Sequence, residues 1–67
     1  MEISARNKIK GTIVEITLGS VMAKLQINIG VGVISSVITI ESVTDLDLKI
    51  GDEVYAIVKS TEVMIGK

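Results

Sequence analysis

The chain has 67 residues, of which 48% are hydrophobic, and seven basic and eight acidic side chains give it a formal net charge of −1. It contains no His, Cys, Trp, Phe or Pro. Disulfides, zinc sites built from thiolates or imidazoles, cysteine nucleophiles and histidine bases are therefore excluded. A domain of this size buries only about 60% of its unfolded surface and is marginally stable alone. We expect one non-catalytic domain over residues 1–67, stabilised by self-association.

Charge and hydropathy also limit the partners. The sequence pI of about 5.2 shows no basic excess for a nucleic acid, and Tyr55, the sole aromatic residue, gives no stacking platform for single strands. The longest uncharged run, 25–40, has 16 residues, fewer than the ~20 that span a bilayer. The charged N-terminal segment lacks the apolar core of a signal peptide. We expect a cytoplasmic protein without nucleic-acid or membrane partners.

Hydrophobic periodicity predicts strands in the first half of the chain. Ile and Val make up 21 residues, and both favour pleated surfaces. Apolar residues alternate over 13–18, and Gly19-Ser20 then predicts a hairpin turn. Over 21–29 the alternation is clearest and predicts a strand with one buried face, formed by Val21, Ala23, Leu25, Ile27 and Ile29.

The second half adds one helix and further strands. A second hairpin is predicted around Gly30-Val31-Gly32, with its return strand at 33–40. The spacing changes over 41–48, which predicts a short helix capped by Thr39 or Ser42. After a turn at 49–52, strands are predicted at 54–59 and 63–65. This order predicts an all-β, five-stranded OB-type Greek-key barrel with one short helix between strands three and four. A Sm-like or SH3-like small barrel is the structural alternative.

Two motifs have a functional and a structural interpretation. Gly30-Val31-Gly32 resembles the start of a phosphate-binding loop, but the third glycine is missing and no βα crossover follows, which favours a hairpin turn. The carboxylates of Asp45, Asp47, Asp52 and Glu53 suit a hard cation in type, but their spacing matches no calcium loop, so surface carboxylates are the favoured interpretation.

Hydrogen-bond donors gather near the two ends of the chain, in Ser4-Ala5-Arg6-Asn7 and in Lys59-Ser60-Thr61. A tetrahedral dianion has four acceptor oxygens and two charges, so Arg6 and Lys59 would balance its charge while hydroxyls and backbone N–H groups complete its hydrogen bonds. Alternatively, these two cations are solvated charges at strand ends that form weak surface ion pairs.

The segments 3–7, 10–13, 38–43 and 59–65 together resemble the molbindins, which are small cytoplasmic molybdate-binding proteins also called molybdenum-pterin-binding proteins. The resemblance covers essentially the whole chain. It implies an OB-type barrel assembled as a homo-hexamer, a trimer of dimers. Molybdate or tungstate would be held at subunit interfaces for storage and homeostasis, and whether a pterin also binds is left open. The alternative is a molybdate-sensing module of the kind appended to transporter ATPases and transcription factors, although no such segment follows Lys67.

The resemblance also implies the binding residues. Different subunits would provide the walls of the main oxyanion site, formed by Ser4, Ala5 through its backbone N–H, Arg6, Thr39, Ser42, Lys59 and Ser60. No protein atom would bind the metal directly. A second oxyanion site is implied near a threefold axis, at Gly19, Ser20, Val21 and Met22. The family often has Asn where Met22 stands, and because Met donates no hydrogen bond, we expect this site to be weaker.

Overall fold

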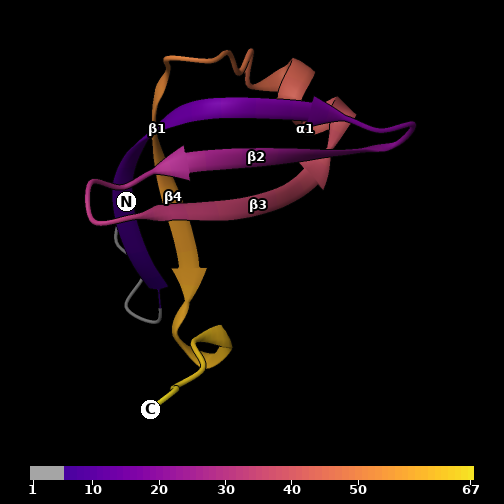
Figure 1. The fold of residues 1–67 in the computed structure, drawn as a ribbon. Helices are drawn as coiled ribbons and strands as arrows, with labels where there is room; N and C mark the ends of the chain where they lie inside the picture. Colours follow the sequence, from indigo (N-terminus) through magenta and orange to yellow (C-terminus); the bar gives the residue numbers. More distant parts are fainter. Residues whose placement is uncertain (1–5) are drawn as a thin grey trace.

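A computed structural model describes residues 6–67 as one curled antiparallel sheet with a short helix and a terminal 3-10 turn (Figure 1). The sheet order is β3-β2-β1-β4. The elements are β1 (Arg6–Leu18), β2 (Met22–Asn28), β3 (Val33–Thr39), α1 (Ile40–Asp45), β4 (Glu53–Lys59) and η1 (Ser60–Glu62). Within 6–67, no helix is long and apolar enough to cross a membrane.

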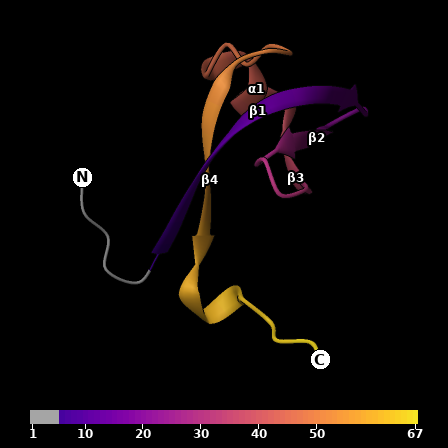
Figure 2. The ribbon, with the colours of Figure 1, turned by 60° about the vertical axis from the view of Figure 1, so that its left-hand side comes forward.

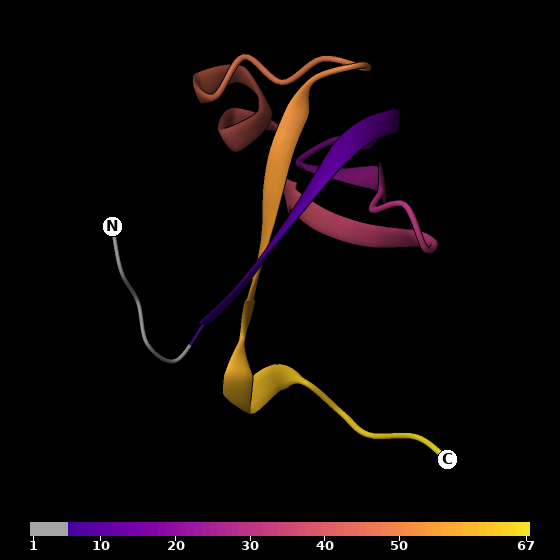
Figure 3. The same cartoon turned by 90° about the vertical axis from the view of Figure 1, so that its left-hand side faces the viewer.

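Strand β1 belongs to both halves of the sheet. It pairs with β4 from Arg6 to Thr12 and with β2 from Thr12 to Leu18. A β-bulge leaves Val14 without a partner on β2, and bulges of this kind bend a strand and increase its twist. The β1–β4 pair therefore turns away from the β2–β3 pair, as Figure 3 shows.

Gly11 makes the bend of β1 sterically possible. A Cβ at this position would lie 2.6 Å from Ile27 Cγ2 and 2.8 Å from the backbone oxygen of Asn28. Both distances are shorter than real Cβ contacts, so any side chain would force β1 and β2 apart. The glycine is itself buried.

Both predicted hairpins are confirmed. The Gly19 N–H donates to the Met22 carbonyl at 2.8 Å between β1 and β2, and the Ile29 N–H donates to the Gly32 carbonyl at 2.9 Å between β2 and β3. Gly30 has φ 94°, a conformation that glycine adopts without strain, and its N–H donates to Asn28 Oδ1 at 2.8 Å. The Gly30-Val31-Gly32 motif is thus a hairpin turn.

Helix α1 is capped as predicted but ends earlier. Thr39 is extended and its Oγ1 accepts a hydrogen bond from the Ser42 N–H at 3.0 Å, which satisfies a free donor of the first turn. The predicted extension to residue 48 is wrong, because the helix ends at Asp45. Asp47 adopts a left-handed conformation with φ 50°, which is incompatible with continuing the helix.

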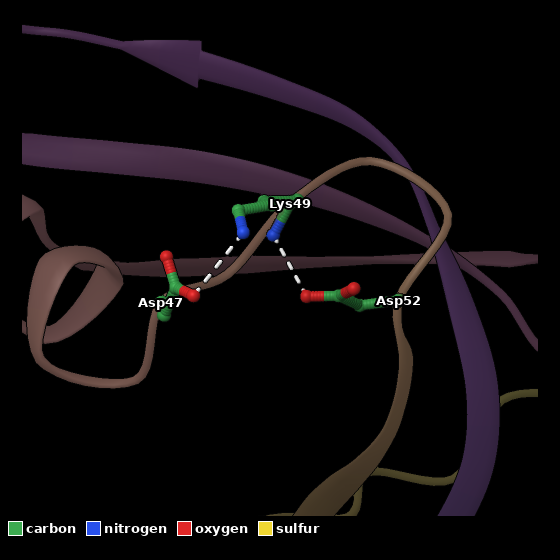
Figure 4. Close-up of polar contacts among 3 residues, drawn as sticks. All are labelled: Asp47, Lys49 and Asp52. Carbon is green, nitrogen blue, oxygen red and sulfur yellow. Dashed lines mark hydrogen bonds and ion pairs between the residues drawn. The ribbon is translucent and has the colours of Figure 1, made fainter.

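The loop from α1 to β4 is held by local contacts (Figure 4). The Lys49 N–H donates to Asp52 Oδ2 at 2.9 Å, and Lys49 Nζ lies 3.2 Å from Asp47 Oδ2. Ile13 anchors the loop to β1, since its N–H donates to the Asp52 carbonyl and its carbonyl accepts from the Gly51 N–H. Of the carboxylates considered as a cation site, Asp47 and Asp52 thus contact Lys49, and Glu53 lies 3.6 Å from Lys10 Nζ. No group of three or more metal-ligating side chains occurs within 6–67.

The core lies inside the curl of the sheet. Its buried side chains are Ile13, Ala23, Leu25 and Ile27. The predicted alternation of β2 and β4 is confirmed, because every second residue of each strand turns inward. The prediction that Val21 belongs to the buried face is wrong, because Val21 lies in the turn before β2 and is 66% exposed. Ile29 follows β2 and is half-buried. In β1 the bulge changes the phase, so that Ile13 is buried while Val14 is 45% exposed.

The mainly β character and the single short helix are confirmed, but the prediction of five strands is wrong. The sheet of the described chain has four strands. Residues 63–65 form no strand, since after η1 they run away from the sheet and pair with no strand of the described chain (Figure 2). Met64 and Ile65 are at least 90% exposed. Alternating apolar residues indicate the capacity for a strand, but a strand also requires a neighbouring strand.

Candidate functional site

Two cations distant in sequence meet at one end of the sheet. Arg6 begins β1, Lys59 ends β4, and the two are direct partners in the antiparallel register. Side chains at paired positions point to the same face with Cβ atoms about 4.5–5.5 Å apart. Neither side chain forms an ion pair within the described chain. Like charges placed in this way repel each other, and an anion between them would relieve the repulsion.

The backbone next to this pair is fixed by turns and hydrogen bonds. The Asn7 carboxamide donates to the Val58 carbonyl at 3.3 Å and ties the start of β1 to the end of β4. Directly after Lys59 the chain enters η1, so that the hydroxyl of Ser60 follows the cation without a spacer. Arg6, Lys59 and Ser60 therefore lie together within one chain, whereas the resemblance implied that different subunits provide the walls that contain them. We call these three residues the cationic group. Ser4 and Ala5 lie outside the described residues.

A shallow surface hollow adjoins the cationic group. Its lining residues are Arg6, Asn7, Lys8, Ile9, Val58 and Val63. Sequence reasoning did not assign Asn7 or Lys8 to the site. For Lys8 a signal was present, since residues two apart in a strand share a face and Arg6 was already a candidate.

Thr39 and Ser42 lie at the other end of the molecule. Thr39 ends β3 and Ser42 belongs to α1, whereas Lys59 lies where β4 leaves the sheet on the far side (Figures 1 and 2). One chain does not bring these hydroxyls to the cationic group. Thr39 Oγ1 donates to Ser42 Oγ at 2.9 Å, which leaves the proton of the Ser42 hydroxyl available to a ligand.

Thr39 and Ser42 instead adjoin the residues predicted as the second site. Thr39 pairs with Met22 across β3 and β2, and the Ile40 N–H donates to the Val21 carbonyl at 2.8 Å. We call Thr39 and Ser42, together with the turn at 19–22, the hydroxyl cluster. Its Gly19 N–H is already bonded to the Met22 carbonyl, so this donor is not free for an anion. Met22 is 43% exposed and brings a thioether to this surface.

A protein-family comparison decides the family. The model of the TOBE domain matches residues 3–65. The chain belongs to the TOBE-domain family. Among curated TOBE relatives, it is 51% identical over 67 residues to a probable molybdenum-pterin-binding protein of Haemophilus influenzae, covering 98% of this chain and 97% of that one. It is also 44% identical over 66 residues to molybdenum-pterin-binding protein 3 of Clostridium pasteurianum, with 97% of each chain covered.

Solved structures of molybdate-binding proteins share the fold of this TOBE domain. A molybdate-binding protein from Sporomusa ovata superposes with a TM-score of 0.94 at 48% identity over the full length of both chains. The cytoplasmic molybdate-binding protein ModG, solved with molybdate bound, gives a TM-score of 0.88 at 35% identity, with 96% of this chain and 46% of that chain covered. The resemblance to molybdenum-pterin-binding proteins drawn from sequence motifs is therefore confirmed.

Proposed function

We propose that this TOBE domain binds molybdate or tungstate without catalysing a reaction, and that it stores the oxyanion in the cytoplasm. The observation that carries the proposal is the direct pairing of Arg6 with Lys59 on one face of the sheet. Similarity to proteins described as molybdate-binding supports the choice of ligand.

The chemistry of the cationic group suits a tetrahedral dianion. Two fixed positive charges balance its two negative charges, and hydrogen bonds from a guanidinium or an ammonium to an oxyanion are stronger than those between neutral groups. Donors from Ser60, and from Ser4 and the Ala5 backbone, complete the coordination. The molybdenum atom needs no protein ligand, because the protein contacts only its oxygens. A pterin is not required by this chemistry, although relatives carry pterin in their names.

We propose that complete sites form between subunits of a hexamer built as a trimer of dimers. The cationic group and the hydroxyl cluster of one chain lie at opposite ends of the sheet. Only a second chain can therefore bring Thr39 and Ser42 to Arg6 and Lys59. The exposed surface also favours assembly. Large apolar side chains of the described residues are exposed in the single chain, among them Leu18, Val31, Met64 and Ile65.

The test combines calorimetry with mass measurement. Molybdate is titrated into the wild type and into Arg6→Ala, and the mass in solution and the metal content are determined on the same preparations. We expect saturable binding by an oligomer and strongly weakened binding by the variant. Absence of binding by both proteins, or equal binding by both, would contradict the proposal.

A sensing module is the second candidate function. The chain is 39% identical over 66 residues to the molybdenum transport protein ModE of Azotobacter vinelandii, although it spans only 24% of that relative. Deletion of the gene distinguishes the two functions. Loss of a storage protein lowers the molybdenum content of cells after molybdate is withdrawn, whereas loss of a sensing module changes transport or transcription while molybdate is present.

A further inference from the structure

An apolar groove lies between the two edge strands of the sheet. The order β3-β2-β1-β4 leaves β3 and β4 as the edges, and both strands line one groove of about 460 Å³. None of its described lining residues is charged. The main apolar lining residues are Ile34, Ile38, Leu48, Val54, Ala56 and Val58.

The side chains along this groove are incompletely buried. In both edge strands the inward-facing residues are half-buried, whereas those of β2, which are Ala23, Leu25 and Ile27, are at most 5% exposed. Edge strands also present backbone N–H and C=O groups that can pair with a further strand. The groove therefore offers an apolar surface and two strand edges to an extended apolar segment.

The chain carries such a segment near its C-terminus, at 63–65. Val63, Met64 and Ile65 are consecutive apolar residues, and the last two are at least 90% exposed. Val63 has φ −85° and ψ 118°, so the segment leaves η1 with an extended backbone. Figures 2 and 3 show that it runs away from the sheet instead of returning along β4. None of its residues lines the groove of its own chain.

We propose that the segment 63–65 of a second copy occupies this groove, and that two copies exchange these segments. Each copy donates one segment and offers one groove, so the exchange is symmetric and closes as a two-fold dimer. An uncharged segment matches an uncharged groove. Full burial of one Met or Ile side chain favours association roughly 10- to 100-fold.

The exchange also places the second copy close to the cationic group. Val63 lines the hollow beside Arg6, and only the η1 turn separates Lys59 from the segment. The copy that receives the segment therefore meets the donor near these two cations. The inference rests on the proposed assembly into dimers, but it does not depend on the identity of the ligand.

Disulfide cross-linking tests the exchange in the full-length oligomer, because the natural chain has no cysteine. Ser36 lines the groove and pairs with the buried Leu25, so a cysteine at this position faces the groove. Ser36→Cys is combined with Ile65→Cys in one protein and with Met64→Cys in another, since adjacent residues of an extended segment face opposite sides. A disulfide requires Cα atoms about 4.4–6.8 Å apart. We expect oxidation to give a covalent dimer in one of the two proteins.

Lys24 provides the matched control for cross-linking. It lies on β2 between the buried Ala23 and Leu25 and therefore faces away from the groove. Lys24→Cys with Ile65→Cys, and each single cysteine variant, should give no covalent dimer. A disulfide within one chain would overturn the inference, because the segment would then fill its own groove. Absence of a cross-link in both Ser36→Cys proteins, or an equal yield of dimer in the control, would also overturn it.

A charge placed in the segment gives an independent measurement. Ile65→Lys changes a residue that is exposed in the single chain, so each chain should fold normally while the dimer loses two buried side chains. We expect its dimer dissociation constant to rise roughly 100-fold or more. Lys67→Ala lies beyond the apolar residues and should assemble like the wild type. The mass in solution over a series of protein concentrations measures both. Unchanged assembly of Ile65→Lys would overturn the inference alone, whereas a monomeric wild type would overturn the proposed assembly as well.

Discussion

Arg6 lies directly opposite Lys59 in the antiparallel register of β1 and β4, although 52 residues separate them in the sequence. The pairing costs stability in the absence of an anion, because like charges face each other at short distance. It is the feature of this TOBE domain that most directly connects the fold with the proposed ligand.

Removing either cation should weaken molybdate binding. Charge-assisted hydrogen bonds contribute about 1.5–3 kcal/mol, so Arg6→Ala and Lys59→Ala should each raise the dissociation constant roughly 10- to 100-fold. Calorimetric titration measures the change. Lys49→Ala is the matched control and should bind like the wild type. If Lys59→Ala and Lys49→Ala have equal effects, Lys59 does not belong to the site.

The same repulsion predicts opposite effects on stability with and without ligand. Without molybdate, Arg6→Gln should melt slightly above the wild type, because the like-charge pair is removed. With molybdate the order of the two melting temperatures should reverse, because the stabilisation of the folded form grows with the logarithm of the ligand concentration divided by the dissociation constant, and the wild type binds more tightly. At 100 times the dissociation constant this stabilisation is about 2.7 kcal/mol. Thermal melts at fixed protein concentration test both parts. A wild-type melt unchanged by saturating molybdate would argue against ligand binding to the folded assembly.

Substitution of Gly11 should destabilise the fold. In Gly11→Ala the new methyl group meets Ile27 and the Asn28 backbone at less than 3 Å, and such overpacking costs about 1–3 kcal/mol. Urea denaturation measures the change in unfolding free energy. Gly32→Ala is the control, because no atom lies within 4 Å of the position that its methyl group would take and its φ is not left-handed. Similar stability of the two variants would mean that β1 can bend without this close approach.

The cap of α1 provides a separate prediction. Thr39→Ala removes the acceptor of the Ser42 N–H and should cost about 1 kcal/mol of unfolding free energy. Thr39→Ser retains the hydroxyl and should therefore keep most of the unfolding free energy that Thr39→Ala loses. Denaturation of the three proteins without ligand separates this structural role from any role in binding. An unchanged stability in Thr39→Ala would show that solvent replaces the cap at no cost.

The second predicted site can be tested by adding a donor. Met22→Asn places an amide beside the turn at 19–22, and we expect additional oxyanion bound per chain because an amide donates hydrogen bonds and a thioether does not. Metal analysis after equilibrium dialysis gives the stoichiometry. Met22→Leu is the control and should match the wild type. An identical metal content in all three proteins would contradict this assignment.

Local patterns predicted local structure well. The alternation of β2 and β4, the hairpins at Gly19 and Gly30, and the cap at Thr39 depend on neighbouring residues, so the sequence contains the information that determines them. The bulge at Val14 could not be predicted, because it depends on how β1 divides its pairing between two strands. The prediction of a fifth strand was wrong because it too depended on strand pairing. The apolar pattern at 63–65 cannot show whether a partner strand lies nearby.

For the site, residue types could be predicted but their arrangement could not. Donors and cations were recognised at both chain ends, and the β1–β4 register then brought Arg6 and Lys59 together. The separation of Thr39 and Ser42 from that pair depends on the curl of the whole sheet, which no local motif encodes. Lys8 lines the hollow beside Arg6, and the alternation of side chains along a strand was enough to place the two on one face.

Strand β1 starts at Arg6 and its last residue, Leu18, directly precedes Gly19, so one strand connects a member of the cationic group with the first residue of the second proposed site. Inserting or deleting one residue between its ends would turn one end over relative to the other, because successive side chains alternate faces. Loops of this TOBE domain can change length without such an effect. We therefore expect length variation in natural variants to concentrate in the hairpin at 29–32 and the loop at 46–52, while the distance from Arg6 to Gly19 stays fixed.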